Sequence, residues 1–360
     1  MNFSPLFPVL ETCTYLNTAN AGLLSVPLME WRRETDRQFS IGASEFRSTT
    51  GNAIVEDARQ TIAGYFHAKP GYTFLVPNMS FGFGKVLDGL EGPQRVLLLQ
   101  DDYPSITYQV KSRGWEHEFI SLLLYEQLEQ RILEAVKRFR PTMLACSITH
   151  YLNGITLNLD LFAAIKAAYP SLLIVADATQ YFGTTAFHFE DTAIDIVLAS
   201  GYKWLSGGYG NGVVLVKEEA AARLYTKAQQ LSGPNELFLK EKNKLALQFE
   251  PGHLDFISYG SLGQAIRLRQ EWGEEQLLQH IDLLSAKAMK AFTERGVIDA
   301  AISMRKQHAP IFTIQVSDRV KEAIRAANII GVNRGTGLRV SLHYYNTKQE
   351  LQQLLEVMDK

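Results

Sequence analysis

Short apolar runs of strand length alternate with longer stretches of helical periodicity, and this alternation constrains the fold more than any other feature. The runs expected to form strands are 73–76, 95–100, 116–120, 142–147, 172–176, 194–199 and 212–216. Helical patterns lie between them at 52–66, 82–89, 106–113, 126–139 and 159–168. Strands that alternate with helices predict βαβ units, and so an α/β fold with a mostly parallel sheet covered on both faces. Ligands bind such sheets at the carboxyl ends of the strands, where we look for chemistry.

The pattern changes after about Pro251. Two helices are expected at 258–272 and 275–295, and two antiparallel strands at 311–316 and 337–342. Thr347 and Glu350 have capping-box spacing and open a last helix at 348–359. We therefore expect an N-terminal arm (1–20), a large domain (21–251) and a smaller α+β domain (252–360) that the arm joins.

Composition excludes several classes of function. The chain has 36 basic and 38 acidic residues, so no basic excess is present to neutralise a nucleic-acid backbone. Two cysteines cannot form a disulfide framework or a four-ligand zinc site, and no metal-binding spacing of histidines occurs. No apolar run approaches the roughly 18 residues of a membrane span, and the first residues lack the pattern of a signal peptide. We expect a soluble cytoplasmic protein without metal, membrane or nucleic-acid partners.

The densest chemical signal lies in residues 175–216. Asp177 follows one apolar run and is followed by Gln180, while Ser200, Tyr202 and Lys203 follow the next run and precede a glycine-rich turn. A lysine at the end of a buried strand is desolvated, which lowers its pKa and makes its amine a nucleophile toward an aldehyde. The alternative is a strand-end lysine with an aspartate in an unrelated β-turn.

These residues resemble a known family. Asp177-Ala-Thr-Gln180 and Ser200-Gly-Tyr-Lys203 are similar to the signature of class V aminotransferases, a group of fold-type I pyridoxal-phosphate (PLP) enzymes. Further blocks resemble the family in the same order; they begin at Tyr15, Pro77, Asp101, Thr149, Phe249 and Leu338. The resemblance implies the fold-type I architecture, with a mostly parallel seven-stranded sheet in a large domain and a smaller α+β C-terminal domain.

The resemblance also implies roles around PLP. Lys203 is the implied Schiff-base lysine, Asp177 the partner of the pyridine nitrogen, Gln180 a hydrogen-bond partner of the phenolic oxygen, and Tyr103 the ring that lies on the cofactor. The phosphate is expected at the start of a helix and beside two hydroxyls, from Met79, Ser80, Ser200 and Tyr202. Tyr151 stands where relatives place an asparagine, and whether it or Asn153 touches the cofactor stays open.

Substrate and subunit contacts follow from the same resemblance. Arg339 is the implied clamp for the substrate carboxylate, because a guanidinium can make two parallel hydrogen bonds to it. Asn17 to Gly22, with Ala21, should form the opposite lip of the site. His253 stands where relatives reach the phosphate of a neighbouring subunit, which implies a homodimer with shared active sites.

The expected reaction is transamination of a small amino acid. Residues 326–339 contain no cysteine, whereas desulfurases carry a nucleophilic cysteine on the loop before the arginine clamp. Cysteine or selenocysteine lyase, kynureninase-like hydrolase and epimerase activities remain alternatives on the same fold. An inactive PLP-fold scaffold is the alternative outside enzymes, and the retained Asp177, Gln180, Lys203 and Arg339 oppose it. A dinucleotide-binding fold is disfavoured because the glycine-rich turn does not open a helix.

Overall fold

Among the residues that the structure describes, seven strands form one central sheet in the order β2-β8-β7-β6-β5-β3-β4. The computed structural model describes residues 3–121, 125–240, 242–335 and 337–360. Strand β8 is antiparallel to both of its neighbours, and the remaining pairs of adjacent strands are parallel. The prediction of a mostly parallel sheet is therefore confirmed. The strands are β2 (Thr73–Val76), β3 (Arg95–Leu99), β4 (Glu116–Ile120), β5 (Met143–Ser147), β6 (Leu173–Asp177), β7 (Ile196–Ser200) and β8 (Gly212–Val216).

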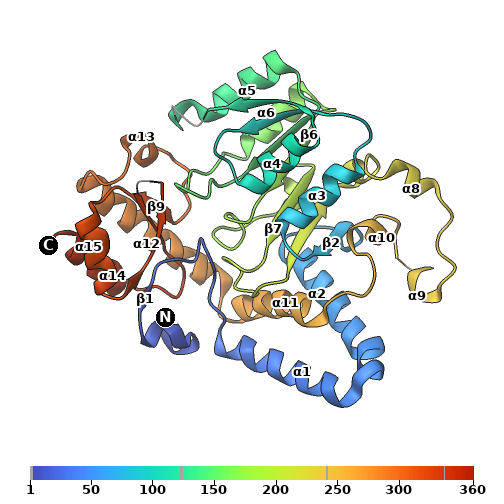
Figure 1. Cartoon of the computed structure of the whole chain (residues 1–360), viewed down its shortest axis with the longest axis horizontal. Coiled ribbons are helices and arrows are strands. Elements are labelled where there is room, and N and C mark those ends of the chain that lie inside the picture. Colours follow the sequence, from blue (N-terminus) through green and yellow to red (C-terminus); the bar gives the residue numbers. More distant parts are fainter. Residues whose placement is uncertain (1–2, 122–124, 241, 336) are drawn as a thin grey trace.

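Helices cover both faces of this sheet, as the βαβ pattern predicts. One face packs against α2 (Asn52–Tyr65), α5 (Leu128–Phe139) and α6 (Asp160–Ala168). The other face packs against α3 (Met79–Gly89) and α4 (Pro104–Ser112), which lie in front of the strands in Figure 1. Within β3, Leu97 and Leu99 face the first layer while Val96 and Leu98 face the second. Alternating side chains that are all apolar hold the sheet between the two helical layers.

The C-terminal elements build a second, smaller sheet in the order β11-β12-β9. Its strands are β9 (Ile311–Ile314), β11 (Val332–Arg334) and β12 (Gly337–Ser341), and neighbouring strands are antiparallel. The sequence predicts β9 and β12 as an antiparallel pair. Around them lie α12 (Glu274–Glu294), α14 (Asp318–Ala326) and α15 (Lys348–Met358). The predicted capping box at the start of α15 is confirmed, because Thr347 and Glu350 exchange both hydrogen bonds.

The N-terminal arm lies beside these C-terminal elements (Figure 1). Strand β1 (Thr14–Tyr15) pairs in parallel with β10 (Ile329–Ile330), and a bridge joins Asn17 to Ser341. These backbone contacts attach the arm to the C-terminal strands. The division into domains at residues 20 and 251 stays a prediction.

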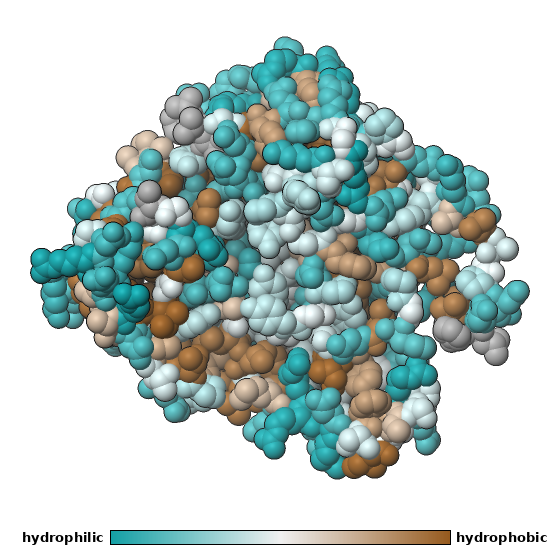
Figure 2. Space-filling view, viewed as in Figure 1, coloured by the Kyte–Doolittle hydropathy of each residue, from teal (hydrophilic) through white to brown (hydrophobic). Residues whose placement is uncertain are grey.

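A long helix, α1 (Val26–Phe46), was not expected from the sequence. It packs against α11 (Phe256–Glu271), which in turn packs against α2. Figure 2 shows apolar side chains along the lower edge of the molecule, where α1 runs, and Phe39 and Ile41 of α1 are exposed. The remaining helices are short: α7 (Glu218–Ala221), α8 (Thr226–Gln230), α9 (Leu237–Lys240), α10 (Ala246–Phe249) and α13 (Ala300–Ser303). Of the helices formed by the described residues, none has both the length and the apolar character that crossing a membrane requires.

Candidate active site

A cavity of about 330 Å³ opens at the carboxyl edge of β6 and β7, the position that the fold class predicts for a ligand. Asp177 is the last residue of β6 and Ser200 the last of β7, so both side chains reach this edge. The volume lies at the lower end of the range for small-molecule sites. Most of the predicted cofactor residues line it together, namely Met79, Ser80, Tyr103, Tyr151, Asp177, Gln180, Ser200, Tyr202 and Lys203.

Lys203 is buried at the bottom of this cavity, with 7% of its surface exposed. Burial lowers the pKa of Lys203 to about 8; Arg339 and Arg334 lower it as well, while Asp177 acts in the opposite direction. The segment that follows the arm contacts the backbone at the lysine, because the Gly22 amide donates to the Tyr202 carbonyl at 2.9 Å. A Cβ atom at Gly22 would lie 1.9 Å from the Lys203 carbonyl oxygen, so only glycine permits this approach.

Asp177 is buried, and burial raises the pKa of its carboxyl group to about 6. The Thr179 amide donates to Asp177 Oδ1 at 2.7 Å and opposes this rise. Asp102, the nearest acid along the edge, is itself held by the amide and hydroxyl of Ser147. A buried aspartate with a raised pKa is a group whose charged form needs a cationic partner.

Gln180 has protein partners at both ends of its amide. Trp204 Nε1 donates to Gln180 Oε1 at 2.7 Å, and Gln180 Nε2 donates to the Ala19 carbonyl at 2.9 Å. Because an indole nitrogen can only donate, it fixes which end of the amide is the oxygen. The second N–H of Nε2 then remains for a ligand oxygen. Trp204 is a positioning residue that sequence reasoning missed, although it directly follows Lys203.

The start of α3 forms one wall of the cavity, and α3 begins at Met79 as expected. The Met79 amide donates to Ser200 Oγ at 2.9 Å, and the Phe81 amide donates to the side chain of Asn78, the N-cap. In this first turn, the amide N–H of Ser80 has no hydrogen-bond partner among the described residues. Ser200 thus ties the helix start to β7, and an anion at this helix terminus meets the Ser80 amide and the dipole.

Tyrosine rings surround the lysine amine. Lys203 Nζ lies 5.9 Å from the ring centroid of Tyr103 and 5.6 Å from that of Tyr202. Tyr103 meets Tyr151 edge to face at 5.8 Å, and Tyr202 stacks on Tyr209 at 4.6 Å. Burial raises the pKa of Tyr202 to about 12, so its hydroxyl stays a neutral hydrogen-bond donor. Tyr209 at the mouth of the cavity was not predicted as a site residue; its only sequence signal is its place in the glycine-rich turn.

Arg339 lies in β12, and only 2% of it is exposed. It does not line the cavity itself but contacts Tyr151, which does. Its Nη1 donates to the Tyr151 carbonyl at 2.7 Å, while buried Nε and Nη2 have no hydrogen-bond partner among the described residues. Burial lowers the pKa of Arg339 to about 10, and Arg334 adds to this. Nε and Nη2 together form a two-donor fork. Elsewhere in this chain, Arg37, Arg269 and Arg295 each use this fork to bind a carboxylate with two hydrogen bonds. The open fork of Arg339 therefore fits a carboxylate.

Asn17 lies on the arm near the strand that carries this arginine, and Ala21 directly follows the arm. Asn17 bridges to Ser341, two residues after Arg339, and its buried Oδ1 has no hydrogen-bond partner within the described part of the chain. The Ala21 carbonyl accepts a hydrogen bond from Tyr15 at 2.8 Å, and the Ala21 amide donates to the Asn17 carbonyl. The arm thus brings an unpartnered amide oxygen to the edge of the small sheet that carries Arg339.

His253 does not share the cavity that holds Lys203. It lines a separate cavity of about 990 Å³, where its Nδ1 lies 3.0 Å from Arg47 Nη1. The predicted contact of His253 with the phosphate of a second subunit therefore remains a prediction.

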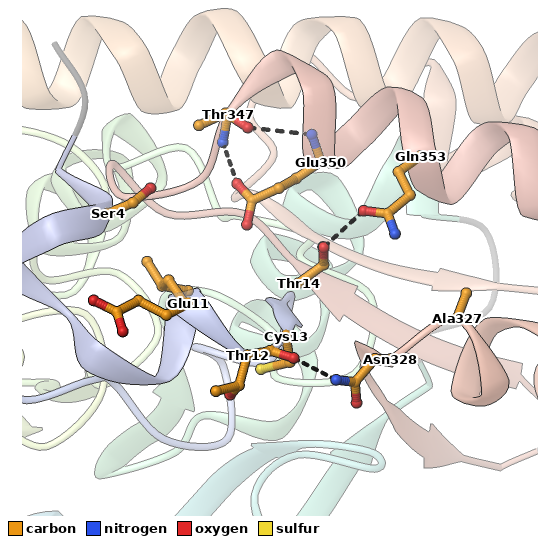
Figure 3. Close-up of a pocket in the computed structure, with 11 residues that line it drawn as sticks. Ser4, Glu11, Thr12, Cys13, Thr14, Ala327, Asn328, Thr347, Glu350 and Gln353 are labelled. Atoms are coloured by element: carbon orange, nitrogen blue, oxygen red, sulfur yellow. Dashed lines mark hydrogen bonds between the residues drawn. The ribbon is translucent and has the colours of Figure 1, made fainter.

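Neither cysteine lies at the active-site cavity. Cys146 is fully buried within β5, where burial raises the pKa of its thiol. Cys13 lies on the arm, in a different pocket formed with Asn328 and the start of α15 (Figure 3). Burial raises the pKa of the Cys13 thiol as well, which disfavours a reactive thiolate.

Comparison with known proteins agrees with this geometry. The sequence profile of the aminotransferase class-V family matches residues 40–354. An uncharacterized aminotransferase of Bacillus subtilis (strain 168) is 26% identical over 368 residues, which cover 98% of this chain and 96% of the relative. A probable cysteine desulfurase of Mycoplasma genitalium is 23% identical over 330 residues, which cover 83% of this chain and 79% of the relative.

The fold is similar to that of the cystine C–S lyase C-DES. The complex of that lyase with its reaction product, cysteine persulfide, superimposes with a TM-score of 0.86 at 18% identity. The match covers 98% of this chain and 99% of the lyase. A second structure of C-DES, a variant with glycine covalently linked to its PLP cofactor, gives a TM-score of 0.87 at 18% identity and covers 99% of this chain and 98% of the variant.

Proposed function

Because the chain belongs to the aminotransferase class-V family of PLP-dependent enzymes, we propose that it is a lyase that cleaves the carbon–sulfur bond of a small α-amino acid. When bound, PLP supplies an aldehyde that joins amines and a ring that withdraws electrons from the bonds at the α-carbon. The other parts of the proposal concern the chain's own residues.

The observation that carries the proposal is the open fork of Arg339 beside Lys203. A guanidinium that is 2% exposed and lacks partners at Nε and Nη2 is costly unless a ligand supplies an anion. A carboxylate held by this fork would bring an amino acid next to Tyr151, which lines the cavity that holds Lys203. The residues present also fit PLP, since buried Asp177 needs a cationic partner and the Ser80 amide at the start of α3 suits a phosphate.

Each residue then has a definite task. Lys203 holds or moves a proton at Nζ, because a pKa near 8 lets the amine do both near neutral pH. Asp177 would hold the ring nitrogen of PLP in its protonated form, because a carboxylate favours a cation beside it. Tyr103 and Tyr202 flank the amine and exclude water from it. Trp204 orients Gln180 so that an N–H of its amide faces the ligand.

The lyase is favoured over a persulfide-forming desulfurase by the placement of the cysteines. Cys146 is enclosed in β5 and Cys13 lies in another pocket, so neither can take sulfur from a substrate at Lys203. Elimination needs no thiolate from the protein: the Cα–H and Cβ–S bonds break and the sulfur group leaves as a thiol or persulfide. Water then converts the three-carbon remainder to pyruvate and ammonium. The fold match to a cystine C–S lyase supports this choice.

Transamination, which the sequence suggested first, is the second candidate. The description of the Bacillus subtilis relative as an aminotransferase supports it. The two reactions differ in what they release: elimination gives pyruvate and a sulfur product without any acceptor, whereas transamination requires a keto acid to receive the amino group.

One set of assays tests the proposal. The purified holoenzyme is incubated with L-cystine, with and without a keto acid, and pyruvate, persulfide sulfur and amino-group transfer are measured side by side. We expect pyruvate and persulfide without a keto acid. Arg339→Gln should weaken the binding of every α-amino acid. The Cys13→Ala/Cys146→Ala double variant should still release sulfur. Sulfur release that vanishes in the double variant, or turnover that depends strictly on a keto acid, would contradict the proposal.

We also propose a homodimer, as the resemblance implies. The exposed apolar side chains of α1, Phe39 and Ile41, give such an interface an apolar component. Sedimentation equilibrium of the holoenzyme measures the state directly, and a monomer at micromolar concentration would contradict it.

A further inference from the structure

The two residues that hold the Gln180 amide are themselves held from the C-terminal part of the chain. At the oxygen end of the amide, the indole of Trp204 donates to Gln180 Oε1 at 2.7 Å. At the nitrogen end, the carbonyl of Ala19 accepts from Gln180 Nε2 at 2.9 Å. Each of these two partners has a further hydrogen bond to a side chain of β12 or of the segment that directly follows it.

His343, two residues after the end of β12, holds the backbone of Trp204. Its Nε2 lies 2.9 Å from the Trp204 carbonyl oxygen, and because a carbonyl can only accept, Nε2 carries the proton. The ring is fully buried, and burial together with Arg269 holds the pKa of His343 well below its usual range. The histidine is therefore neutral, and its one N–H is directed to the backbone of the residue that orients Gln180.

The same carbonyl also accepts from Arg269 of α11, but that arginine serves several groups at once. Its Nη1 donates to the Trp204 carbonyl and its Nη2 to the Gly183 carbonyl, each at 3.0 Å, and its fork binds Glu274. The bond to Trp204 is, by contrast, the only hydrogen bond that the ring of His343 makes with the described residues, and its buried Nδ1 has no partner there. His343 is thus the side chain whose replacement changes the support of Trp204 without breaking an ion pair.

Ser341, the last residue of β12, holds the other partner of the amide. The Ala19 amide donates to Ser341 Oγ at 3.0 Å, and the Ser341 amide donates to the Leu16 carbonyl at 2.8 Å. Because side chains two apart along a strand share a face, Ser341 and Arg339 point to the same side of β12. The strand that carries the open fork therefore also holds the part of the arm that fixes Gln180 Nε2.

We propose that His343 and Ser341 are positioning residues that set the orientation of Gln180 toward the phenolic oxygen of PLP. The inference rests on the proposed function, because it takes Gln180 as the residue that faces this oxygen. His343 acts through Trp204 on the oxygen end of the amide, and Ser341 acts through Ala19 on the nitrogen end. With both ends fixed, the second N–H of Gln180 Nε2 stays directed at the ligand oxygen, and a hydrogen bond to that oxygen favours its ionised form.

The test reads the cofactor and not turnover. The absorbance of the cofactor in the holoenzyme is titrated with pH in the absence of substrate. His343→Leu and Ser341→Ala should each raise the midpoint of this titration by about 0.4 to 1 pH unit, the range of one hydrogen bond. His343→Gln keeps an N–H donor in the place of Nε2 and should titrate close to wild type. All of these variants retain the charged groups that act on the cavity, namely Asp177, Lys203, Arg334 and Arg339.

Two controls separate positioning from a general effect on folding. His280→Leu removes a histidine whose Nε2 lies 2.8 Å from another backbone carbonyl, that of Asn346, and should leave the midpoint unchanged. In a Gln180→Ala background, His343→Leu and Ser341→Ala should cause no further shift, because the group through which they act is absent. Urea unfolding of each apoprotein measures any loss of stability separately.

An unchanged midpoint in His343→Leu or in Ser341→Ala would overturn the proposal for the residue replaced. Shifts that persist in full without Gln180, or a shift in His343→Gln as large as in His343→Leu, would overturn it as well. The reaction class is measured separately, and an enzyme that transaminates would give the same midpoints because no substrate is present. An enzyme that releases pyruvate from L-cystine but shows unshifted midpoints would keep the proposed function and lose this inference.

Discussion

Replacement of Asp177 by asparagine should stabilise the apoprotein while it lowers turnover of the holoenzyme. The carboxyl group is buried, and its pKa is raised from 3.8 to about 6. A pKa that is higher in the folded than in the unfolded state means that folding penalises the ionised form. The penalty is absent below about pH 4, grows as the pH rises through the folded pKa, and is then fully present.

The size of this penalty follows from the two pKa values. At pH 8 the rise from 3.8 to about 6 corresponds to about 3 kcal/mol, and at pH 5 to about 1.6 kcal/mol. Asparagine has the same shape, carries no charge and can still accept the hydrogen bond from the Thr179 amide at 2.7 Å. The apo Asp177→Asn variant should therefore gain these amounts of unfolding free energy over the apo wild type.

The assay is urea unfolding of both apoproteins at pH 5 and pH 8, followed by far-UV circular dichroism. With PLP bound the order should reverse, because removing one partner of a buried ion pair costs about 3–5 kcal/mol. If this loss of about 3–5 kcal/mol appears in the activation free energy, turnover should fall by about two to four orders of magnitude. An apo variant that is no more stable than wild type at pH 8, or a gain equal at both pH values, would refute the reasoning.

Three further predictions concern the lysine and its surroundings. Imine formation between apoprotein and added PLP should rise with an apparent pKa of about 8, since lowering the pKa of Lys203 from 10.5 raises its neutral fraction at pH 7 about 300-fold. A midpoint near 10 would contradict this. Trp204→Phe should shift the cofactor absorbance and raise the activation free energy of turnover by about 1–3 kcal/mol, because Gln180 Oε1 loses its buried donor. If adding Gln180→Ala to this variant has its full separate effect, the two residues act independently and the prediction is wrong. Gly22→Ala should lower PLP content and thermal stability, whereas Gly64→Ala in α2, where the added Cβ meets no atom within 4 Å, should not.

The sequence was sufficient for the sheet and for the residues at its edge. Six strands of the large sheet are runs of mostly apolar residues, so their positions are a local property of the chain, whereas β4 begins with three polar residues. Asp177 and Lys203 follow such runs directly, which places them at the carboxyl edge without knowledge of the rest of the fold. Helix α1 escaped prediction because it buries few side chains, Leu28, Thr35 and Phe46, and so has little apolar periodicity.

The residues that sequence reasoning missed depend on contacts between distant parts of the chain. Trp204 matters because its indole reaches Gln180, 24 residues earlier. Register and side-chain contact are products of packing, and a pattern along one chain does not contain them.

The central claim is that Lys203 is the amine that carries PLP, and one labelling measurement tests it most directly. The holoenzyme is reduced with borohydride, digested and mapped by mass spectrometry, beside a Lys203→Ala variant that has been mixed with PLP and shown by circular dichroism to be folded. We predict a single pyridoxyl-labelled peptide in the wild-type digest, with the label on Lys203, and no labelled peptide from the variant. A label on another lysine, or wild-type protein that takes up no PLP, would contradict the account.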